Sequence, residues 1–138
     1  MSITKAIDSA YKLMEERKWD KIYWAIDLHG VCLESNYTTF SHKWLNLDVV
    51  EGLRAISDRP ESVIILWSSC HSEEFNKILT FFSDEGIRVK YFNRNPDVAN
   101  TQSGCFDKKF YFNVLLDDKA GFDPETDWVK IVERMRLK

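Results

Sequence analysis

The stretch Trp24–Ser35, WAIDLHGVCLES, joins the end of an apolar run to a carboxylate, a histidine and a glycine. The run begins at Lys21 (KIYWAI), and its β-branched and aromatic residues favour a strand over a helix. It stops at Asp27, where a buried strand would reach the surface of the fold. A carboxylate at the tip of a hydrophobic strand makes this point of the chain a candidate site.

Strand patterns and helix patterns alternate along the chain. Short apolar runs that are typical of strands occupy residues 21–26, 62–67, 87–92 and 110–116. Apolar positions at helical spacing predict helices over residues 2–17, near 48–57, over 72–85 and from Asp123-Pro124 onward. This order predicts an α/β fold, a three-layer sandwich with a Rossmann-like, mainly parallel sheet. Because we find no linker, repeat or low-complexity tract, we expect residues 1–138 to form one domain.

Residues at the helix boundaries and on the helix faces sharpen this prediction. Asp48 and Glu51 resemble a capping box, which would open a helix that buries Val50, Leu53 and Ile56. Gly86 is a typical stop for the third helix. The third and fourth helices are expected to bury one apolar face each, made of Phe75, Ile78, Leu79 and Phe82 in the third and of Trp128, Ile131, Val132 and Met135 in the fourth.

Composition and charge are those of an ordinary soluble protein. Of the 138 residues, 44% are hydrophobic and 30% are charged, and the net charge of −3 provides no global basic field to attract nucleic acid. No window approaches the roughly 18 apolar residues of a membrane span, and the acids of the amphipathic N-terminal segment exclude a signal peptide. The cysteines, at no metal-like spacing, are expected to be reduced thiols: Cys32, Cys70 and Cys105. We therefore expect a cytoplasmic protein with no membrane partner.

Polar residues follow three of the predicted strands where each strand ends. They are Asp27, Ser68-Ser69 and Asp117-Asp118, and Lys108-Lys109 precede the last strand. The carboxyl ends of parallel strands meet at one edge of a sheet, so these groups are expected to lie together. Crowded carboxylates need a cation, and oxygen ligands favour Mg²⁺, which usually shares its coordination sphere with a substrate phosphate. Each residue alone has a plain structural explanation as a turn, a helix cap or a surface lysine, whereas their joint order indicates phosphoryl transfer.

The four segments, in this order, resemble the motifs of the haloacid-dehalogenase (HAD) superfamily of phosphotransferases. That family shows a strand ending in DxD, a strand ending in Thr or Ser, a lysine, and a strand ending in an acidic pair. The matching segments here are IYWAIDLHGV, VIILWSSC, FDKKFYF with Lys109, and FNVLLDDKAGF. The chain looks closest to the small members without a large cap domain, and the resemblance implies a Mg²⁺-dependent phosphohydrolase that acts on phosphomonoesters.

The resemblance implies a role for each matching position. Asp27 would be the nucleophile that forms an aspartyl-phosphate. Ser68 would hydrogen-bond the phosphoryl oxygens, and Lys109 would neutralise the nucleophile and the transferring group. Strand alternation makes Lys108 the weaker choice for that lysine. The ligands of Mg²⁺ would be Asp27, the main-chain carbonyl of His29, Asp117 and Asp118.

Residue 29 departs from the family pattern. Family phosphatases have a second Asp there, which protonates the leaving oxygen and then activates water, and this chain has His29. A histidine can do acid–base work near neutral pH, although a neighbouring Mg²⁺ disfavours its cationic form. Three outcomes stay open: a phosphatase that uses His29, a slow enzyme or stable phospho-aspartate acceptor, and a catalytically impaired phosphate- or metal-binding protein. A receiver-like phospho-acceptor uses similar residues, but with the acidic pair first and the lysine last.

The chain has no room for a large cap domain, and this affects which substrates and partners are expected. Capless members of the family tend to act on bulky substrates or to close the site by homo-oligomerisation. Loops at 31–45 and 93–107 would flank an open cleft and would offer as substrate contacts His42, Trp44, Arg94 and Asn95. The expected partner is a phosphorylated substrate whose class the sequence leaves open, and the net charge disfavours nucleic acid.

Overall fold

A four-stranded, all-parallel sheet organises the chain. The computed structural model describes residues 2–34 and 42–138, so residues 35–41 of the predicted 31–45 loop lie outside the described part. The strands are β1 (Ile22–Asp27), β2 (Ser62–Trp67), β3 (Tyr91–Phe92) and β4 (Val114–Leu116), in the sheet order β3-β2-β1-β4. The helices are α1 (Ile3–Arg17), α2 (Leu47–Ser57), α3 (Phe75–Ser83) and α4 (Asp127–Met135), with short 3₁₀ turns η1 (Ser72–Glu74) and η2 (Asp118–Ala120). The predicted α/β fold with a parallel sheet, flanking helices and no cap domain among these residues is confirmed.

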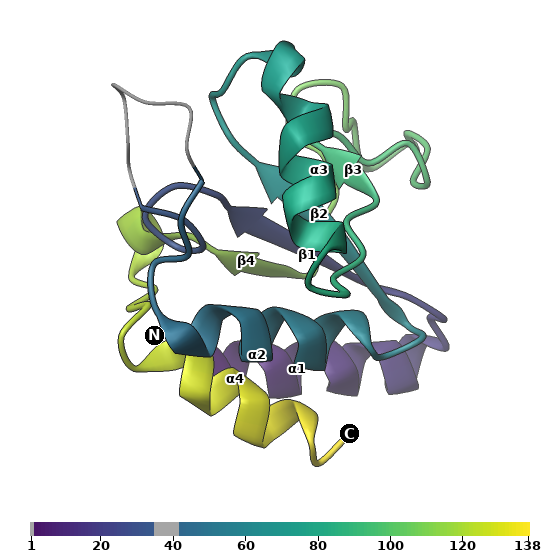
Figure 1. Cartoon of the computed structure of the whole chain (residues 1–138). Coiled ribbons are helices and arrows are strands. Elements are labelled where there is room, and N and C mark those ends of the chain that lie inside the picture. The colour runs from purple at the N-terminus through teal and green to yellow at the C-terminus, as the bar shows by residue number, and fades with distance from the viewer. Residues whose placement is uncertain (1, 35–41) are drawn as a thin grey trace.

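The strand order explains which connection covers which face of the sheet. The chain moves from β1 to β2 to β3 in one direction, so right-handed crossovers place α2 and α3 on the same face. It then returns past β1 to β4, and the same rule sends the connection of residues 93–113 across the opposite face. Figure 1 shows α1, α2 and α4 side by side along one side of the sheet. The reversal of strand order at β1 marks the edge where α/β proteins bind ligands.

The first face of the sheet carries the main hydrophobic core. Fully buried side chains of β1 and β2, among them Trp24 and Ile64, pack there against the helices. α4 lies against α2 because Gly52 has no side chain: a Cβ at this position would be only 2.3 Å from the ring of Trp128. On the same face, the ring of Phe75 in α3 stacks on Phe92 of β3 with 4.1 Å between ring centroids.

The second face of the sheet carries a smaller cluster. Ala25, Val63 and Ile65 from the strands are buried there together with Phe110. Phe110 belongs to the 93–113 connection, so the layer on this face is supplied by extended chain rather than by a helix. Part of the face stays open to solvent, since Trp67 and Leu115 are 44% and 37% exposed.

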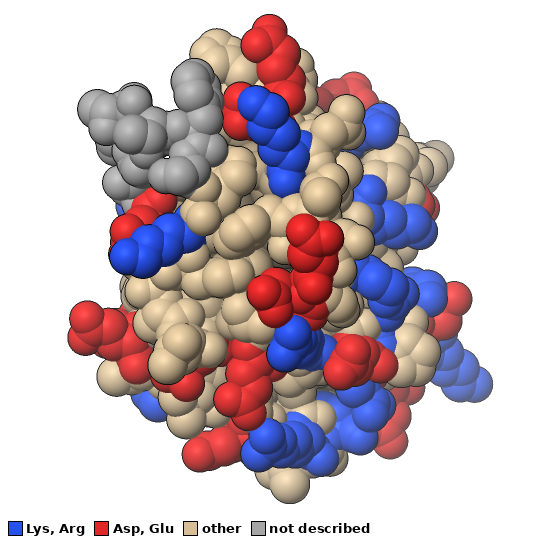
Figure 2. Space-filling view, in the orientation of Figure 1, with Lys and Arg blue, Asp and Glu red and all other residues tan. Residues whose placement is uncertain are grey.

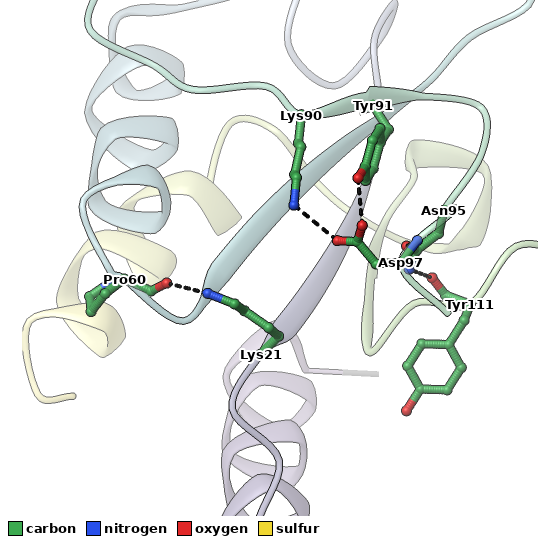
Figure 3. A network of polar contacts seen from close by, with 7 residues as sticks. All are labelled: Lys21, Pro60, Lys90, Tyr91, Asn95, Asp97 and Tyr111. Atoms are coloured by element: carbon green, nitrogen blue, oxygen red, sulfur yellow. Dashed lines mark hydrogen bonds and ion pairs between the residues drawn. The ribbon is translucent and has the colours of Figure 1, made fainter. Parts of the chain in front are cut away.

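A polar network holds the 93–113 connection to β3 (Figure 3). The carboxylate of Asp97 lies between the ammonium of Lys90, at 3.1 Å, and the hydroxyl of Tyr91, which donates to it at 2.5 Å. Further along, the side-chain amide of Asn95 donates to the carbonyl of Tyr111 at 2.9 Å. Buried Asn95, predicted as a substrate contact, thus joins two parts of the connection to each other.

Two strands are shorter than the sequence pattern predicts. The predicted 87–92 strand pairs only at Tyr91–Phe92, and the predicted 110–116 strand pairs only from Val114 onward. At the second, Asn113 explains the difference: its side-chain oxygen accepts the N–H of Tyr23 at 2.7 Å, in place of a backbone carbonyl. The side chain of Asn113 thus takes the place of a backbone carbonyl in the pairing at this position, so β4 begins at Val114 although the apolar pattern begins at residue 110.

Helix boundaries also depart from the prediction. The predicted Asp48–Glu51 capping box is wrong, because Asn46 caps α2 by accepting the N–H of Asp48 at 3.0 Å. α2 consequently buries Val49 rather than Val50, together with Leu53 and Ile56 as predicted. The predicted 72–85 helix begins as the 3₁₀ turn η1 and becomes α-helical only at Phe75, and it ends before Gly86, whose φ is +75°.

The beginning of α4 is later than predicted, while its buried face is confirmed. Asp123 starts a turn rather than the helix, and its N–H donates to the carboxylate of Asp127 at 2.8 Å. The helix proper begins at Asp127 and buries the four predicted residues, Trp128, Ile131, Val132 and Met135.

The outer surface mixes charges of both signs. Figure 2 shows Lys and Arg side chains interspersed with Asp and Glu over one face of the molecule. Arg134 and Lys138 both reach the carboxylate of Asp8 at 3.1 Å, which links α4 to α1. Within the described part of the chain, no helix is long and apolar enough to cross a membrane, and all three cysteines are free thiols.

Gly52→Ala is expected to lower the free energy of unfolding by about 1–2 kcal/mol. The new methyl group would overlap the Trp128 ring, and the better helix propensity of alanine, about 1 kcal/mol, offsets the overpacking only in part. Urea unfolding measures the change. The control is Leu47→Ala at the start of the same helix, where the side chain is 95% exposed, and it is expected to change stability by less than about 0.5 kcal/mol. A Gly52→Ala protein as stable as the wild type would contradict the close packing of α2 on α4.

Candidate metal and phosphate site

Three carboxylates meet at the carboxyl edge of the sheet. β1 and β4 pair in parallel with Ile26 opposite Leu116, so the next residues, Asp27 and Asp117, leave the two strands at the same level. One carboxylate oxygen from each of Asp27, Asp117 and Asp118 lies within 4.8 Å of the other two. We call these three residues the carboxylate cluster. Asp27 and Asp117 are partly buried and Asp118 is exposed, so the cluster is reachable from solvent.

The turns after the two strands hold the carboxylates in place. Asp117 caps η2, because its Oδ1 accepts the N–H of Lys119 at 2.9 Å. Gly30, with φ of +89°, lies directly against Asp118, and a Cβ there would be 2.8 Å from Oδ2 of that residue. The glycine of the opening sequence stretch is therefore required for the close approach of the Asp118 carboxylate.

The electrostatics of the cluster favour a bound cation. Burial, the hydrogen bond with Asp118 and the negative charges of Asp117 and Asp118 together raise the pKa of Asp27 to about 7. Near neutral pH the cluster thus retains a proton when no cation is present. Three carboxylates offer hard oxygen ligands, which suit Mg²⁺ or Ca²⁺ better than a soft metal. The arrangement could hold a divalent cation in place of that proton.

His29 lies in the tight turn that follows β1. The turn is closed by backbone hydrogen bonds from Cys32 and Leu33 to the carbonyl of Leu28, both at 2.9 Å. His29 is partly buried, and burial together with the nearby His42 lowers its pKa. Its ring is therefore mainly neutral at pH 7, which suits a proton acceptor better than a proton donor.

α4 supports this turn through the side chain of Trp128. The indole N–H of Trp128 donates to the carbonyl of Val31 at 2.9 Å, and the bond is buried. The same ring packs on Gly52, so the turn that carries His29 and Gly30 rests on the α2–α4 contact. The sequence marks Trp128 as a core residue and contains no signal for its polar contact with the turn.

Ser68 follows β2 and is held by a residue that sequence reasoning missed. The side chain of Asn93 accepts the N–H of Ser68 at 2.8 Å and donates to its carbonyl at 2.7 Å. Asn93 itself has φ of +56°, a conformation that asparagine tolerates better than most residues. An asparagine directly after a predicted strand is the only sequence signal for this clamp. The Oγ of Ser68 accepts the N–H of Cys70 at 3.1 Å, and its hydroxyl hydrogen donates to no acceptor among the described residues.

Lys109 lies on the second face of the sheet. Its side chain is exposed, and its ammonium lies 5.7 Å from the ring centroid of Phe112. Lys109 and Asp117 line the same cavity, so the lysine belongs to the surroundings of the carboxylate cluster. Its predicted role toward Asp27 stays a prediction.

Three residues predicted as substrate contacts make contacts within the protein, and their predicted role toward a substrate stays a prediction. The ring of Trp44 packs against Phe81 and Phe82, with centroid distances of 4.7 and 4.9 Å. Asn95 is buried, as described above, and the guanidinium of Arg94 lies 5.9 Å from the ring centroid of Tyr91. His42 differs from these: its Nε2 is buried without a hydrogen-bond partner among the described residues and lies 4.0 Å from Glu74.

Comparisons with known proteins support the fold. No protein-family model matches the sequence, and no curated protein matches it significantly. The structure is similar to that of a conserved protein from Bacteroides thetaiotaomicron, with a TM-score of 0.63 and 22% sequence identity. The similarity covers 85% of this chain and 91% of that one. At this level of identity the likeness shows the α/β fold and carries no information on activity.

Mg²⁺ or Mn²⁺ is expected to raise the midpoint of thermal unfolding, and Asp117→Asn is expected to remove most of that increase. A cation at about 100 times its Kd stabilises the folded state by about 2.7 kcal/mol. Differential scanning calorimetry with and without the metal measures the effect. Asp84→Asn, an exposed carboxylate at the end of α3, is the matched control and should keep the full increase. An equal metal response of the Asp117 and Asp84 variants would exclude the cluster as the binding site.

In EDTA, the contribution of Asp27 to stability is expected to fall as the pH rises from about 4 to about 7. The folded protein holds a proton on Asp27 up to a pKa of about 7, whereas the unfolded chain releases it near 3.8, so the folded state binds more protons in this window. Asp27→Asn removes this group and should flatten the decline. Urea unfolding of both proteins at pH 5 and pH 8 tests the difference, with Asp84→Asn as the control. Identical pH dependence in wild type and Asp27→Asn would show that the carboxyl is unperturbed.

Proposed function

We propose that this protein is a Mg²⁺-dependent phosphohydrolase of the HAD type that cleaves phosphomonoesters through an aspartyl-phosphate on Asp27. The observation that carries the proposal is the carboxylate cluster at the carboxyl ends of β1 and β4. It lies at the reversal of strand order, where parallel α/β sheets bind ligands. Ser68, at the end of the neighbouring strand β2, adds a hydroxyl to the same edge.

Each group of the cluster has a defined task in this proposal. Mg²⁺, held by Asp27, Asp117, Asp118 and the carbonyl of His29, would supply positive charge for the phosphate oxygens. One oxygen of Asp27 attacks phosphorus as the ester oxygen leaves with a proton from the minor protonated form of His29, and the neutral ring that results later takes a proton from the attacking water. Water then attacks the phosphorus of the aspartyl-phosphate, which releases inorganic phosphate and restores the Asp27 carboxylate.

Ser68 and Lys109 stabilise the transferring group. The Oγ of Ser68 accepts the N–H of Cys70, and the hydroxyl hydrogen would donate to a phosphoryl oxygen. The Asn93 clamp holds the backbone of Ser68 and so fixes the position of that donor. Lys109 provides a positive charge beside Asp117, and a rotation of its exposed side chain from Phe112 would bring that charge to the phosphate.

His29 takes the proton-transfer role that the family gives to an aspartate. Its lowered pKa makes the neutral ring the main form at pH 7, and a neutral imidazole can accept a proton from the attacking water. The same property makes it a weaker donor to the leaving oxygen. The second candidate is therefore a catalytically impaired HAD-like protein that binds metal and phosphate and hydrolyses substrate only slowly.

Release of phosphate from a panel of phosphomonoesters with Mg²⁺ tests the main proposal. Asp27→Asn should reduce kcat by at least about 10³-fold, and EDTA should abolish turnover. Asp20→Asn, an exposed acid beyond the other end of β1, is the control and should keep full activity. Absence of turnover on the whole panel by a folded, metal-binding protein would overturn the hydrolase proposal and leave the binding protein.

His29→Asp separates the two candidates. If His29 is the working acid–base group, the substitution changes the pH profile of kcat and lowers the rate near neutral pH. If the native chain is impaired, the same substitution raises a rate that is otherwise near zero. Steady-state kinetics between pH 5 and pH 9 measure both outcomes.

A further inference from the structure

A cavity of about 240 Å³ lies beside the carboxylate cluster on the second face of the sheet. Its apolar walls are Ala25, Trp67, Phe110, Phe112 and Leu115, and we call these five residues the aromatic recess. Asp117 of the carboxylate cluster lines the same cavity. The recess and the candidate metal site therefore share a boundary.

Strand alternation explains why the recess and the carboxylates face the same way. Side chains two residues apart on a strand point to the same face of the sheet. The side chain of Asp27 is therefore expected on the same face as that of Ala25, and the side chain of Asp117 on the same face as that of Leu115, which is the second face. The sheet register agrees, because Ala25 pairs with Leu115 and Asp27 pairs with Trp67. A group held at the carboxylates can thus extend directly over the recess.

The recess stays open for two local reasons. Position 25 carries only a methyl group at the centre of the face, where a larger side chain would fill the space. The face is covered by extended chain rather than by a helix, which leaves Trp67 and Leu115 partly exposed, at 44% and 37%. Trp67 is fixed against Phe110 with 5.5 Å between ring centroids, so the aromatic wall is already formed.

The charges at the cavity favour an anionic ligand with an apolar part. Lys108 and Lys109 both line the cavity, and Asp117 connects it to the candidate Mg²⁺ site. A phosphate at that site would lie at the edge of a cavity that carries two lysines, whereas the floor of the recess offers only apolar and aromatic atoms. An apolar cavity of about 150 Å³ is enough to hold one benzene ring, so this recess accommodates one substituted aromatic ring.

We propose that the aromatic recess binds the ring of an aryl phosphate monoester whose phosphate lies at the carboxylate cluster. The proposal rests on the proposed function for the position of the phosphate and adds the class of its ester group. Edge-to-face contacts with Trp67, Phe110 and Phe112 favour an aromatic ring over an alkyl chain of the same size. The ring belongs either to a small aryl phosphate or to a phosphotyrosine side chain, which share this chemistry.

Isothermal titration calorimetry with phosphonates that cannot be hydrolysed tests the recess without relying on turnover. With Mg²⁺ present, phenylphosphonate is expected to bind at least about tenfold more tightly than methylphosphonate, because its ring is removed from water. Leu115→Trp fills the recess and should abolish this preference while methylphosphonate binding is unchanged. Leu137→Trp, the same substitution at an exposed position near the C-terminus, is the control and should keep the preference.

The outcomes of this experiment separate the two proposals. Equal binding of the two phosphonates overturns the recess and leaves the hydrolase proposal standing. A preference for phenylphosphonate in a protein that hydrolyses no phosphomonoester supports the recess and overturns the hydrolase. Failure of both phosphonates to bind overturns the recess, and sedimentation velocity then shows whether a second copy of the chain covers the face. Comparing kcat/KM for phenyl phosphate and for a phosphotyrosyl peptide distinguishes the two sources of the ring.

Discussion

The parallel pairing of β1 with β4 is the constraint on which the rest of the structure depends. It places Asp27 and Asp117 on adjacent strand ends although they are far apart in the sequence. It also requires the chain to cross from β3 back over β1, and this crossing creates the edge at which ligands can enter. Fold and candidate chemistry therefore have one common origin, the strand order.

This arrangement brings the carboxylates of the cluster so close together that they repel one another. A raised pKa of Asp27 means that the folded state disfavours its charged form when no cation is present. The surrounding structure tolerates this because the residues that hold the cluster are well packed: Gly30 lies against Asp118, and Trp128 supports the turn through Val31. A bound cation would replace the repulsion between the carboxylates by attraction. The same three residues are therefore both the candidate metal ligands and a source of pH-dependent stability.

The two faces of the sheet have different tasks. The helices bury the first face and supply the main core, with Trp24, Trp128 and Phe82 among its largest side chains. Among the described residues, the second face is covered by the 93–113 connection, which the Asp97 network holds to β3. Because no helix of the described part of the chain packs on the second face, side chains that point toward it near the strand ends can contact a ligand.

The sequence by itself determined the order and type of the main elements, since apolar periodicity and strand-forming residues act over a few neighbouring positions. It also determined which carboxylates and which hydroxyl end the strands, because Asp27, Ser68 and Asp117 each follow directly on an apolar run. Only the tertiary structure decided where β4 begins, because the side chain of Asn113, just before the strand, accepts the N–H of Tyr23 on another strand. It likewise decided that Asn93 clamps Ser68, and it holds the capping residue Asn46 in place through a hydrogen bond from its side-chain amide to the carbonyl of Pro124. These contacts compete with alternatives of similar local energy, and only the long-range packing of the sheet, which no local pattern encodes, selects among them.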